Sequence, residues 1–368
     1  MKVILYKKCG WKKVYLIKLD GNYNVNSKEE LTFCNNVSNM EFDLSTDKFY
    51  YLENEKGYKT EVVIISENTD EVAIVYNRKK KAYYISIIDT NNYYNKAISV
   101  TLTDEKNLFF RKDKSKIIDI IVPNNYSKDK KYGLLLMFDG QNLYDKTVSG
   151  NYTDKNDPYG SWQVDVSMSM LNKNTDLEYI VVGIEHTDML RTNELLTAPT
   201  FGILRNKELL SEPERIGYID HLNDFINETL LPYMLANYNI DLNNIGISGS
   251  SMGGLGCHYI GLKNLGKYKF ILCYTPASAL VVDSAWINFY NRLDFKNNLE
   301  KLPLFYFFQG INDDLEKILY QGNINLTKNM VNAGYPKELI KEYIEPNAMH
   351  NEVAWRYAFN YMIYHSFK

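Results

Sequence analysis

The stretch Gly249-Ser250-Ser251-Met252-Gly253 constrains the fold of this chain more than any other, because it predicts a sharp turn from a strand into a helix. Residues 244–248 are predicted to form a short buried strand, and residues 255–265 have the spacing of a helix. So tight a turn leaves no room for side chains two positions before and after its central residue, and glycine occupies both. A plain Gly/Ser loop is the alternative, but the flanking strand and helix favour an exposed Ser251.

A serine hydroxyl becomes an effective nucleophile only beside a general base, and that base needs a carboxylate to fix its tautomer. The pattern G-x-S-x-G is the nucleophile elbow of α/β-hydrolases. In that fold the acid and then the histidine follow the serine along the chain, each on a loop after a later strand. The chain beyond Ser251 should therefore supply an acid and then a base.

Two aspartates are candidates for the acid. Asp313 and Asp314 follow the apolar run 304–308, at the predicted end of a strand. We favour Asp313 and keep Asp314 as the alternative. The non-catalytic interpretation is an Asx-turn or a helix N-cap before Leu315, and it suits Asp314 best.

His350 is the candidate base, because it lies in a loop between the predicted strand 342–345 and the last helix. The other histidines fit this role less well. His258 falls inside the helix after the elbow, and His221 opens an earlier helix. His186 follows a strand and could line the pocket, but it precedes the nucleophile.

An ester hydrolase must also stabilise the oxyanion of the tetrahedral intermediate, usually with backbone N–H groups. The N–H of Met252, at the start of the elbow helix, is one candidate, since the helix dipole favours negative charge there. The N–H of Gln141, in the loop after the apolar strand 134–138, is the other. Gly140 beside it would allow the substrate to approach closely.

The chain divides into two parts by its sequence texture. Residues 1–106 offer short Val-, Ile- and Tyr-rich runs and are predicted to form a small all-β sandwich, either a carbohydrate-binding or an Ig-like module. Residues 107–368 alternate apolar runs with helical patterns, including helices at 218–235 and 315–333. This order predicts an α/β-hydrolase domain with a mostly parallel sheet and helices on both faces. The predicted strands of the whole chain include 14–19, 61–66, 71–77, 82–89, 97–103, 117–122, 134–138, 179–184, 245–248, 270–274, 304–308 and 342–345.

Composition excludes several classes of protein. With 42 basic and 45 acidic residues, the chain lacks the basic surplus of a nucleic-acid-binding protein. No apolar run approaches the length of a membrane span, and the N-terminus lacks the apolar core of a secretion signal, so we expect a cytoplasmic protein if the chain is complete. Four scattered cysteines indicate free thiols, and five histidines without an H-E-x-x-H pattern argue against zinc.

Several ordered motifs resemble those of the esterase D-like esterases, a superfamily that includes enterochelin esterases, S-formylglutathione hydrolases and feruloyl and acetylxylan esterases. The matching stretches lie at 137–145, 161–165, 181–184, 249–254 and 350–356. The resemblance covers residues 108–368. It implies serine-dependent ester hydrolysis without a cofactor, with Ser251 as nucleophile and His350 as base.

The resemblance also bears on residues around the site. The feruloyl-esterase pattern G-x-N-D matches Gly310-Ile311-Asn312-Asp313, which supports Asp313, although some siderophore-esterase relatives work with a Ser-His dyad. Arg191 and Glu194 resemble an R-x-x-E/D loop beside the pocket, and a structural salt bridge would explain them equally well. Trp355, within the motif that begins at His350, is a further candidate for contact with substrate.

The N-terminal part resembles known modules only faintly. The stretch from Gly10 to Tyr23 has some likeness to starch-binding modules, and an N-terminal β-domain also precedes the catalytic domain of enterochelin esterases. Trp11 and Tyr23, if exposed, could stack on sugar rings, whereas such aromatics more often pack against strands.

The sequence therefore predicts a serine carboxylesterase that acts on a siderophore or related ester. An acetyl or feruloyl esterase for carbohydrate is the first alternative, and acyl transfer is open if water is excluded. A non-catalytic binding protein with the hydrolase fold is the alternative from another class. The oligomeric state is not predicted.

Overall fold

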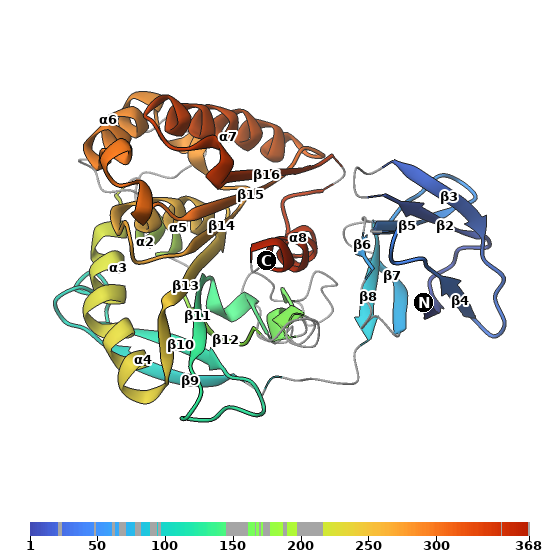
Figure 1. The fold of residues 1–368 in the computed structure, drawn as a ribbon. Helices are drawn as coiled ribbons and strands as arrows, with labels where there is room; N and C mark the ends of the chain where they lie inside the picture. The colour runs from blue at the N-terminus through green and yellow to red at the C-terminus, as the bar shows by residue number, and fades with distance from the viewer. Residues whose placement is uncertain are drawn as a thin grey trace.

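The computed structural model describes residues 1–20, 24–47, 49–60, 63–65, 71–77, 82–88, 94, 97–144, 161–165, 167–168, 171, 177–186, 190–196, 216–346 and 348–366. Within these residues the chain forms two four-stranded sheets near the N-terminus and one eight-stranded sheet (Figure 1). The two small sheets lie to one side of the large one.

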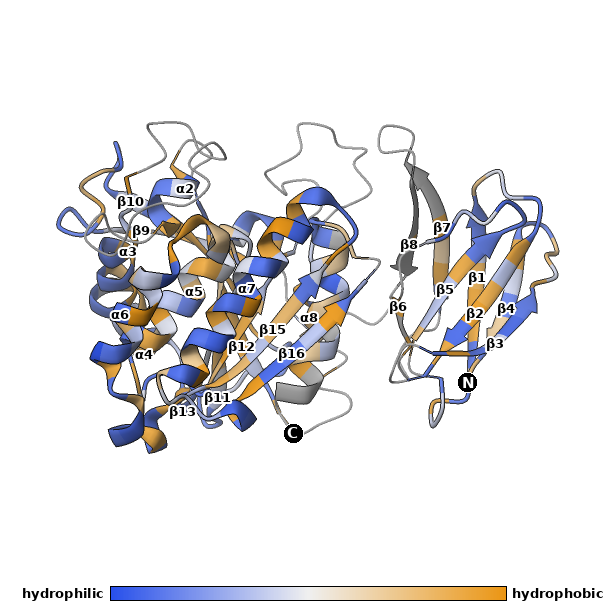
Figure 2. Ribbon diagram, turned by 90° about the horizontal axis from the view of Figure 1, so that it is seen from above, coloured by the Kyte–Doolittle hydropathy of each residue, from blue (hydrophilic) through white to orange (hydrophobic). Residues whose placement is uncertain are grey.

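The two small sheets pack face to face around one apolar core, which confirms the predicted β-sandwich. Buried and less buried residues alternate over much of the first, second and fifth strands, and Figure 2 shows hydrophobic residues in the strands of both sheets. One sheet has the order β4 (Val37–Glu41), β1 (Lys2–Lys8), β7 (Glu71–Asn77) and β8 (Ala82–Ile88), and the other has β3 (Val25–Glu30), β2 (Val14–Leu19), β5 (Phe49–Asn54) and β6 (Val63–Ile64).

Trp11 is part of this core and is only 3% exposed. Stacking of Trp11 on a sugar ring, which we considered from the sequence, is therefore wrong for this structure. The packing that holds β1, β2 and β5 together uses the indole instead. The second candidate, Tyr23, lies outside the described residues.

The eight-stranded sheet confirms the predicted α/β fold class. Neighbouring strands are parallel from β16 to β12, and the last two strands, β10 and β9, are antiparallel. In spatial order the strands are β16 (Ile340–Glu345), β15 (Leu304–Gly310), β14 (Phe270–Tyr274), β13 (Ile240–Ser250), β11 (Tyr132–Phe138), β12 (Tyr179–Ile184), β10 (Ser115–Ile121) and β9 (Ile98–Thr103).

Strand β9 pairs with β10 over the register Ile98↔Ile120 to Thr103↔Ser115. The sequence placed this strand in the first domain, with the boundary at 106/107. The structure places it in the second sheet, because the β9–β10 pairing adds an edge strand to the large sheet. Its alternating Ile, Val and Leu residues do not reveal which sheet it joins.

Helices cover both faces of the large sheet, and alternate strand residues point to each face. The predicted helix at 218–235 divides into α3, the π-helical turn η4 and α4, and Pro232 lies at the start of α4, where it cannot donate a helical hydrogen bond. One face carries α2 (Arg191–Leu195), α3 (Ile219–Phe225), η4 (Ile226–Leu230), α4 (Leu231–Asn237), α5 (Met252–Lys263), α6 (Asp283–Leu293) and α7 (Asp314–Asn332), and the other carries α8 (Glu352–Ser366).

Helix α8 lies between the large sheet and the N-terminal sandwich (Figure 1). Phe359 and Met362 face the large sheet and are fully buried. On the other side, Tyr357 and Tyr361 meet Phe49 of β5, with ring centroids 6.1 and 5.8 Å apart. The last helix is therefore packed against both parts of the chain.

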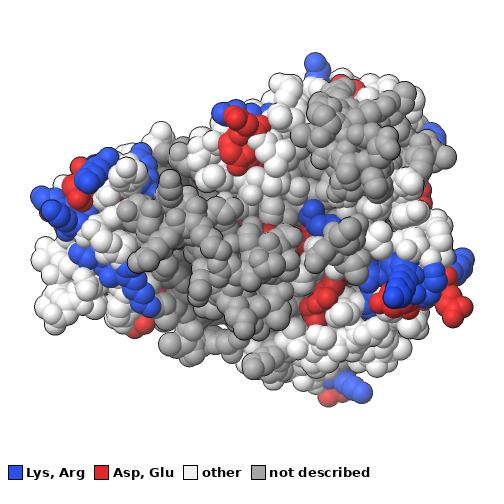
Figure 3. All heavy atoms as spheres, turned by 180° about the vertical axis from the view of Figure 1, so that it is seen from behind, with Lys and Arg blue, Asp and Glu red and all other residues white. Residues whose placement is uncertain are grey.

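Basic and acidic residues lie in mixed groups on the face shown in Figure 3, as far as its described atoms extend. Across the described parts of the chain, no helix combines the length and the apolar character that crossing a membrane requires.

Candidate active site

Ser251 occupies a strained turn between the end of β13 and the start of α5. Its backbone has φ 54° and ψ −118°, a conformation that residues with a β-carbon rarely adopt. A β-carbon on Gly249 would lie 2.6 Å from the carbonyl carbon of Gly253. This confirms that the turn needs glycine there. A strained backbone conformation therefore positions Ser251 at the end of a central strand of the sheet.

Two backbone N–H groups are free of helical partners beside this turn. The first hydrogen bond of α5 joins Leu255 N to Ser251 O at 3.0 Å, so the N–H of Met252 precedes the helical ladder. In the 3₁₀-helix η1 (Gly140–Asn142) the first bond joins Asn142 N to Asp139 O at 2.9 Å, which leaves the N–H of Gln141 free in the same way. The side chain of Gln141 accepts a hydrogen bond from His186 N at 3.3 Å.

Gly140 is required by packing against the neighbouring strand. A β-carbon there would lie 2.7 Å from the backbone carbon of Gly183 and 2.9 Å from the nitrogen of Glu185. The missing side chain thus lets the loop lie on β12. This differs from the sequence-based reason, which was close approach of the substrate.

Arg191 joins the η1 loop to the serine turn. Its Nε and Nη2 donate to the two carboxylate oxygens of Asp139 at 2.7 and 2.8 Å, and Nη2 also lies 3.5 Å from the carbonyl oxygen of Ser250. Burial alone would raise the pKa of Asp139, but the charge and hydrogen bonds of Arg191 bring it below its usual value. Arg191 therefore clamps the loop that carries Gln141 against the strand that carries Ser251.

Replacing Arg191 by lysine should lower kcat about 10- to 100-fold with little change in KM. Lysine cannot reproduce the planar two-point contact with Asp139, so the Gln141 N–H would lose its position relative to Ser251. Steady-state kinetics on a chromogenic ester measure this. Arg292→Lys on the exposed side of α6 is the matched control and should leave both constants unchanged. A pure rise in KM in the Arg191 variant would indicate direct contact with substrate instead.

Glu194 belongs to a buried cluster of charges. Its carboxylate meets Arg111 Nη1 and Lys116 Nζ, both at 2.6 Å, and the side chain is only 2% exposed. Burial lowers the pKa of Lys116, and the charge of Glu194 acts in the opposite direction. The cluster anchors α2, and with it Arg191, to the region of β10.

The imidazole of His350 is held by Glu316, a residue that the sequence analysis did not consider. Nδ1 of His350 lies 3.0 Å from Oε1 of Glu316, whose side chain is fully buried. Burial raises the pKa of Glu316 above its usual value, and the hydrogen bond and charge of His350 offset part of this effect.

Asp313 contacts the backbone of His350 and not the imidazole ring, which is the contact that the sequence analysis predicted for it. Its carboxylate caps α7 by accepting from Glu316 N at 2.8 Å, and its other oxygen accepts from the backbone N–H of His350 at 2.9 Å. Asp313 thus holds the backbone of the His350 loop, whereas Glu316 contacts the His350 ring. The alternative, Asp314, is the first residue of α7, with a 98% exposed side chain.

The serine turn and the base loop meet at the segment that follows β14. Ser251 N donates to Tyr274 O at 2.8 Å. The hydroxyl of Thr275 accepts from Trp355 Nε1 at 2.8 Å and donates to Glu316. Trp355 in turn packs edge-on against His350, with centroids 5.0 Å apart.

Among the described residues, no hydrogen bond joins the Ser251 hydroxyl to His350. Such bonds often tighten only when substrate binds. Trp355 is 6% exposed, and its contact with substrate stays a prediction.

The structure also shows the polar partners of two further histidines, His186 and His258. His186 Nε2 lies 3.5 Å from Asp139 Oδ1, at the edge of the η1 loop. His258 is fully buried, with Nε2 2.8 Å from the Tyr290 hydroxyl, and burial lowers its pKa to about 3. His258 is therefore a neutral core residue.

The described residues contain no group of three or more His, Cys, Asp or Glu side chains that could hold a metal ion. The four cysteines are free, as predicted.

The parallel sheet, the strained serine turn after its central strand and the helix behind it define an α/β-hydrolase with an N-terminal β-domain. Residues 113–364 match the family described as "Putative esterase", and the chain belongs to this family of esterases. Family membership suggests that the protein is an ester hydrolase. A search of curated proteins finds no match.

Solved structures share the fold. Ferric enterobactin esterase from Salmonella typhimurium matches 97% of this chain and 89% of its own, with a TM-score of 0.53 and 12% identity. A siderophore hydrolase from Aspergillus nidulans matches 74% of this chain and 95% of its own (TM-score 0.52, 14% identity). A ferulic acid esterase from Anaeromyces mucronatus, solved with ferulic acid, matches 77% and 95% (TM-score 0.51, 18% identity).

Proposed function

We propose that this protein is a serine carboxylesterase with Ser251 as nucleophile, His350 as general base and Glu316 as the acid that orients the base. The observation that carries the proposal is the 3.0 Å contact between His350 Nδ1 and Glu316 Oε1. This pair is connected to the strained serine turn through residues 274 and 275. A carboxylate on Nδ1 leaves Nε2 free to accept a proton from the serine hydroxyl.

The reaction follows from these positions. Ser251 Oγ attacks the ester carbonyl carbon while His350 Nε2 takes its proton, and the N–H groups of Met252 and Gln141 stabilise the oxyanion. The imidazolium then protonates the leaving alcohol, and an acyl-enzyme remains on Ser251. Water, activated by the same imidazole, releases the acid and restores the serine.

For the substrate we propose a siderophore ester. Support comes from the likeness to ferric enterobactin esterase, which extends over both the sandwich and the large sheet of this chain. The runner-up is a feruloyl or acetyl ester of a carbohydrate, which rests on the likeness to ferulic acid esterase over 77% of this chain. Hydrolysis of a panel of trilactone siderophores, feruloylated and acetylated sugars and S-formylglutathione separates these classes.

Covalent trapping tests the proposed mechanism directly. A fluorophosphonate probe should add one phosphonyl group to the protein, and mass spectrometry of the digest should place it on the peptide that contains Ser251. Heat-denatured protein is the control, because labelling needs the folded site. A folded protein that hydrolyses esters but carries the label elsewhere, or none at all, contradicts the assignment of Ser251.

A further inference from the structure

A row of buried side-chain hydrogen bonds leads from Glu316 away from the active site. Gln309, near the end of β15, is 4% exposed, and its Nε2 donates to Glu316 Oε2 at 2.6 Å and to the carbonyl oxygen of Gly310 at 2.7 Å. Glu316 therefore meets His350 with one carboxylate oxygen and Gln309 with the other.

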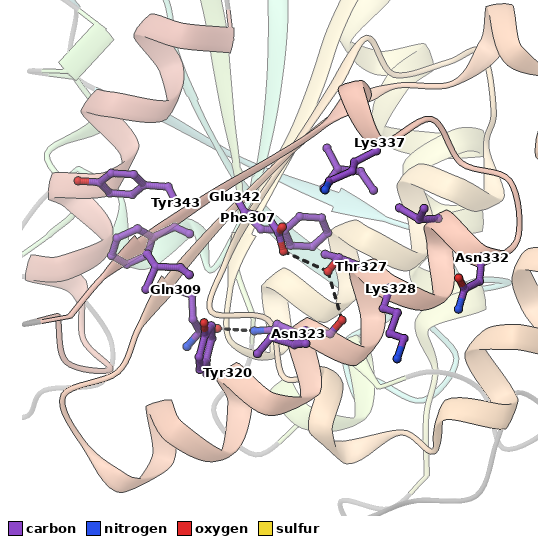
Figure 4. Close-up of a pocket in the computed structure, with 15 residues that line it drawn as sticks. Phe307, Gln309, Tyr320, Asn323, Thr327, Lys328, Asn332, Lys337, Glu342 and Tyr343 are labelled. Atoms are coloured by element: carbon purple, nitrogen blue, oxygen red, sulfur yellow. Dashed lines mark hydrogen bonds between the residues drawn. The ribbon is translucent and has the colours of Figure 1, made fainter. Parts of the chain in front are cut away.

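The row continues behind Gln309. Asn323 of α7 donates its Nδ2 to Gln309 Oε1 at 2.5 Å (Figure 4), and its Oδ1 accepts from the hydroxyl of Ser278. Asn323 and Ser278 are 6% and 3% exposed. All the groups that link Ser278 to Glu316 are thus withdrawn from water.

The donors and acceptors fix the direction of this row. A carboxylate only accepts hydrogen bonds, so the NH₂ side of Gln309 must face Glu316 and its oxygen must face Asn323. Turning the Gln309 amide over would set oxygen against carboxylate oxygen and NH₂ against NH₂. Asn323, held by Ser278, prevents this, since its own NH₂ points at Gln309.

We propose that Gln309, locked by Asn323, is a positioning residue that holds the Glu316 carboxylate ionised and aimed at His350. The inference rests on the proposed esterase mechanism and adds to it a second layer of residues. Glu316 lies in surroundings that disfavour its charge, because burial raises its pKa. Hydrogen bonds to the ionised form act against this, and Gln309 supplies a short one.

The row of hydrogen-bonded side chains borders a cavity, so its residues can be replaced without overpacking. Gln309 and Asn323 line a cavity of about 360 Å³ between α7 and β16, together with residues such as Tyr320, Thr327 and Tyr343 (Figure 4). Free space beside the amides lets an apolar side chain of similar size settle without overpacking. Thr327, one helical turn after Asn323, donates to Glu342 at 3.1 Å and is not part of the row.

Gln309→Met tests the proposal, because methionine fills the same space without donating. We expect the acidic limb of the kcat–pH profile to move up by about one to two pH units, and kcat at pH 7 to fall about tenfold, while KM stays near the wild-type value. Gln309→Glu should move the limb further, because a second carboxylate beside Glu316 opposes its ionisation. Asn323→Leu should move it in the same direction by less.

Thr327→Val is the matched control, since it removes a hydrogen bond in the same cavity and should leave the profile unchanged. Melting temperatures of all variants identify any that do not fold; if Gln309→Met is among them, Asn323→Leu carries the decision. A folded variant with a wild-type acidic limb overturns the positioning role. If wild-type protein shows no hydrolysis that depends on Ser251, the esterase mechanism fails, and the inference about Gln309 fails with it. This outcome can be distinguished from the others because wild type is measured before any Gln309 variant is made.

Discussion

Replacing Glu316 by glutamine should reduce kcat about 10³- to 10⁴-fold with little effect on KM. The amide NH₂ of the new side chain would face His350 Nδ1 and favour the tautomer that carries its proton on Nε2. That nitrogen could then no longer accept the serine proton, although the shape of the site would be kept. Steady-state kinetics with p-nitrophenyl acetate measure the loss.

Asp313→Asn is the matched control, because it makes the same carboxylate-to-amide change at a neighbouring residue. Asparagine still caps a helix well, and its oxygen can still accept from one of the two N–H groups that Asp313 serves. We expect a loss of about tenfold or less, from a looser base loop. If Asp313→Asn cost as much as Glu316→Gln, the original sequence-based choice of acid would be restored.

Stability separates a catalytic loss from a folding defect. The pKa of Glu316 is raised in the folded protein, mainly by burial, so the folded state binds its proton more tightly than the unfolded chain does. Stability contributed by this group is present below the unfolded pKa and is lost as pH rises through the folded pKa. Glu316→Gln should therefore have a free energy of unfolding at pH 7 that is no lower than wild type, as urea titration would show.

Ser251→Ala should abolish turnover, with a decrease in kcat of about 10⁴- to 10⁶-fold. The variant keeps the two N–H groups that we propose as oxyanion donors, so any residual rate reports what they achieve without a nucleophile. The side chain is lost at a strained turn, yet alanine meets the same backbone restriction as serine, so the fold should survive. Activity on an ester, measured beside circular dichroism of both proteins, checks the expectation.

Equal turnover by wild type and Ser251→Ala would refute the esterase mechanism. A protein that binds an ester tightly without hydrolysing it would then support the alternative of a binding protein with the hydrolase fold. Calorimetric titration with a non-hydrolysable ester analogue distinguishes binding from the absence of any interaction.

The strand pattern and the serine turn were predictable because their signals are local. Apolar runs such as Tyr179–Ile184 and Phe270–Tyr274 coincide with strands, since buried parallel strands are apolar throughout. Gly249 is dictated by a contact with Gly253, which lies four residues further along the chain. Sequence reasoning is reliable where the cause and the effect lie this close along the chain.

Glu316, the acid that we propose, was not considered from the sequence because its contact with His350 is made across the fold. Asp313 and Glu316 form the pattern D-x-x-E that often opens a helix, with the first residue as cap and the fourth in the first turn. Read in this way, the cap would have been assigned to Asp313, and Glu316 would have become a candidate. That its side chain turns toward His350 rather than back to the cap is settled by tertiary packing, which the pattern does not contain.

The same limit applies to β9 and Trp11. The sequence of a short alternating strand does not indicate which sheet the strand will join. The sequence around Trp11 likewise does not indicate whether the indole is buried or exposed. In both cases the outcome follows from partners that lie tens of residues away, β10 for the strand and the sandwich core for the indole.

Helix α8 begins two residues after His350 and supports the N-terminal sandwich on its outer side. Cutting the chain between the sandwich and the large sheet would leave Ile17, Leu19 and Phe49 facing solvent on one fragment and a tyrosine stripe on the other. We expect each fragment to aggregate through the apolar surface that the cut exposes to solvent. The N-terminal sandwich thus packs on the helix that follows the proposed base, and we expect a protein shortened to its hydrolase part to lose both solubility and activity.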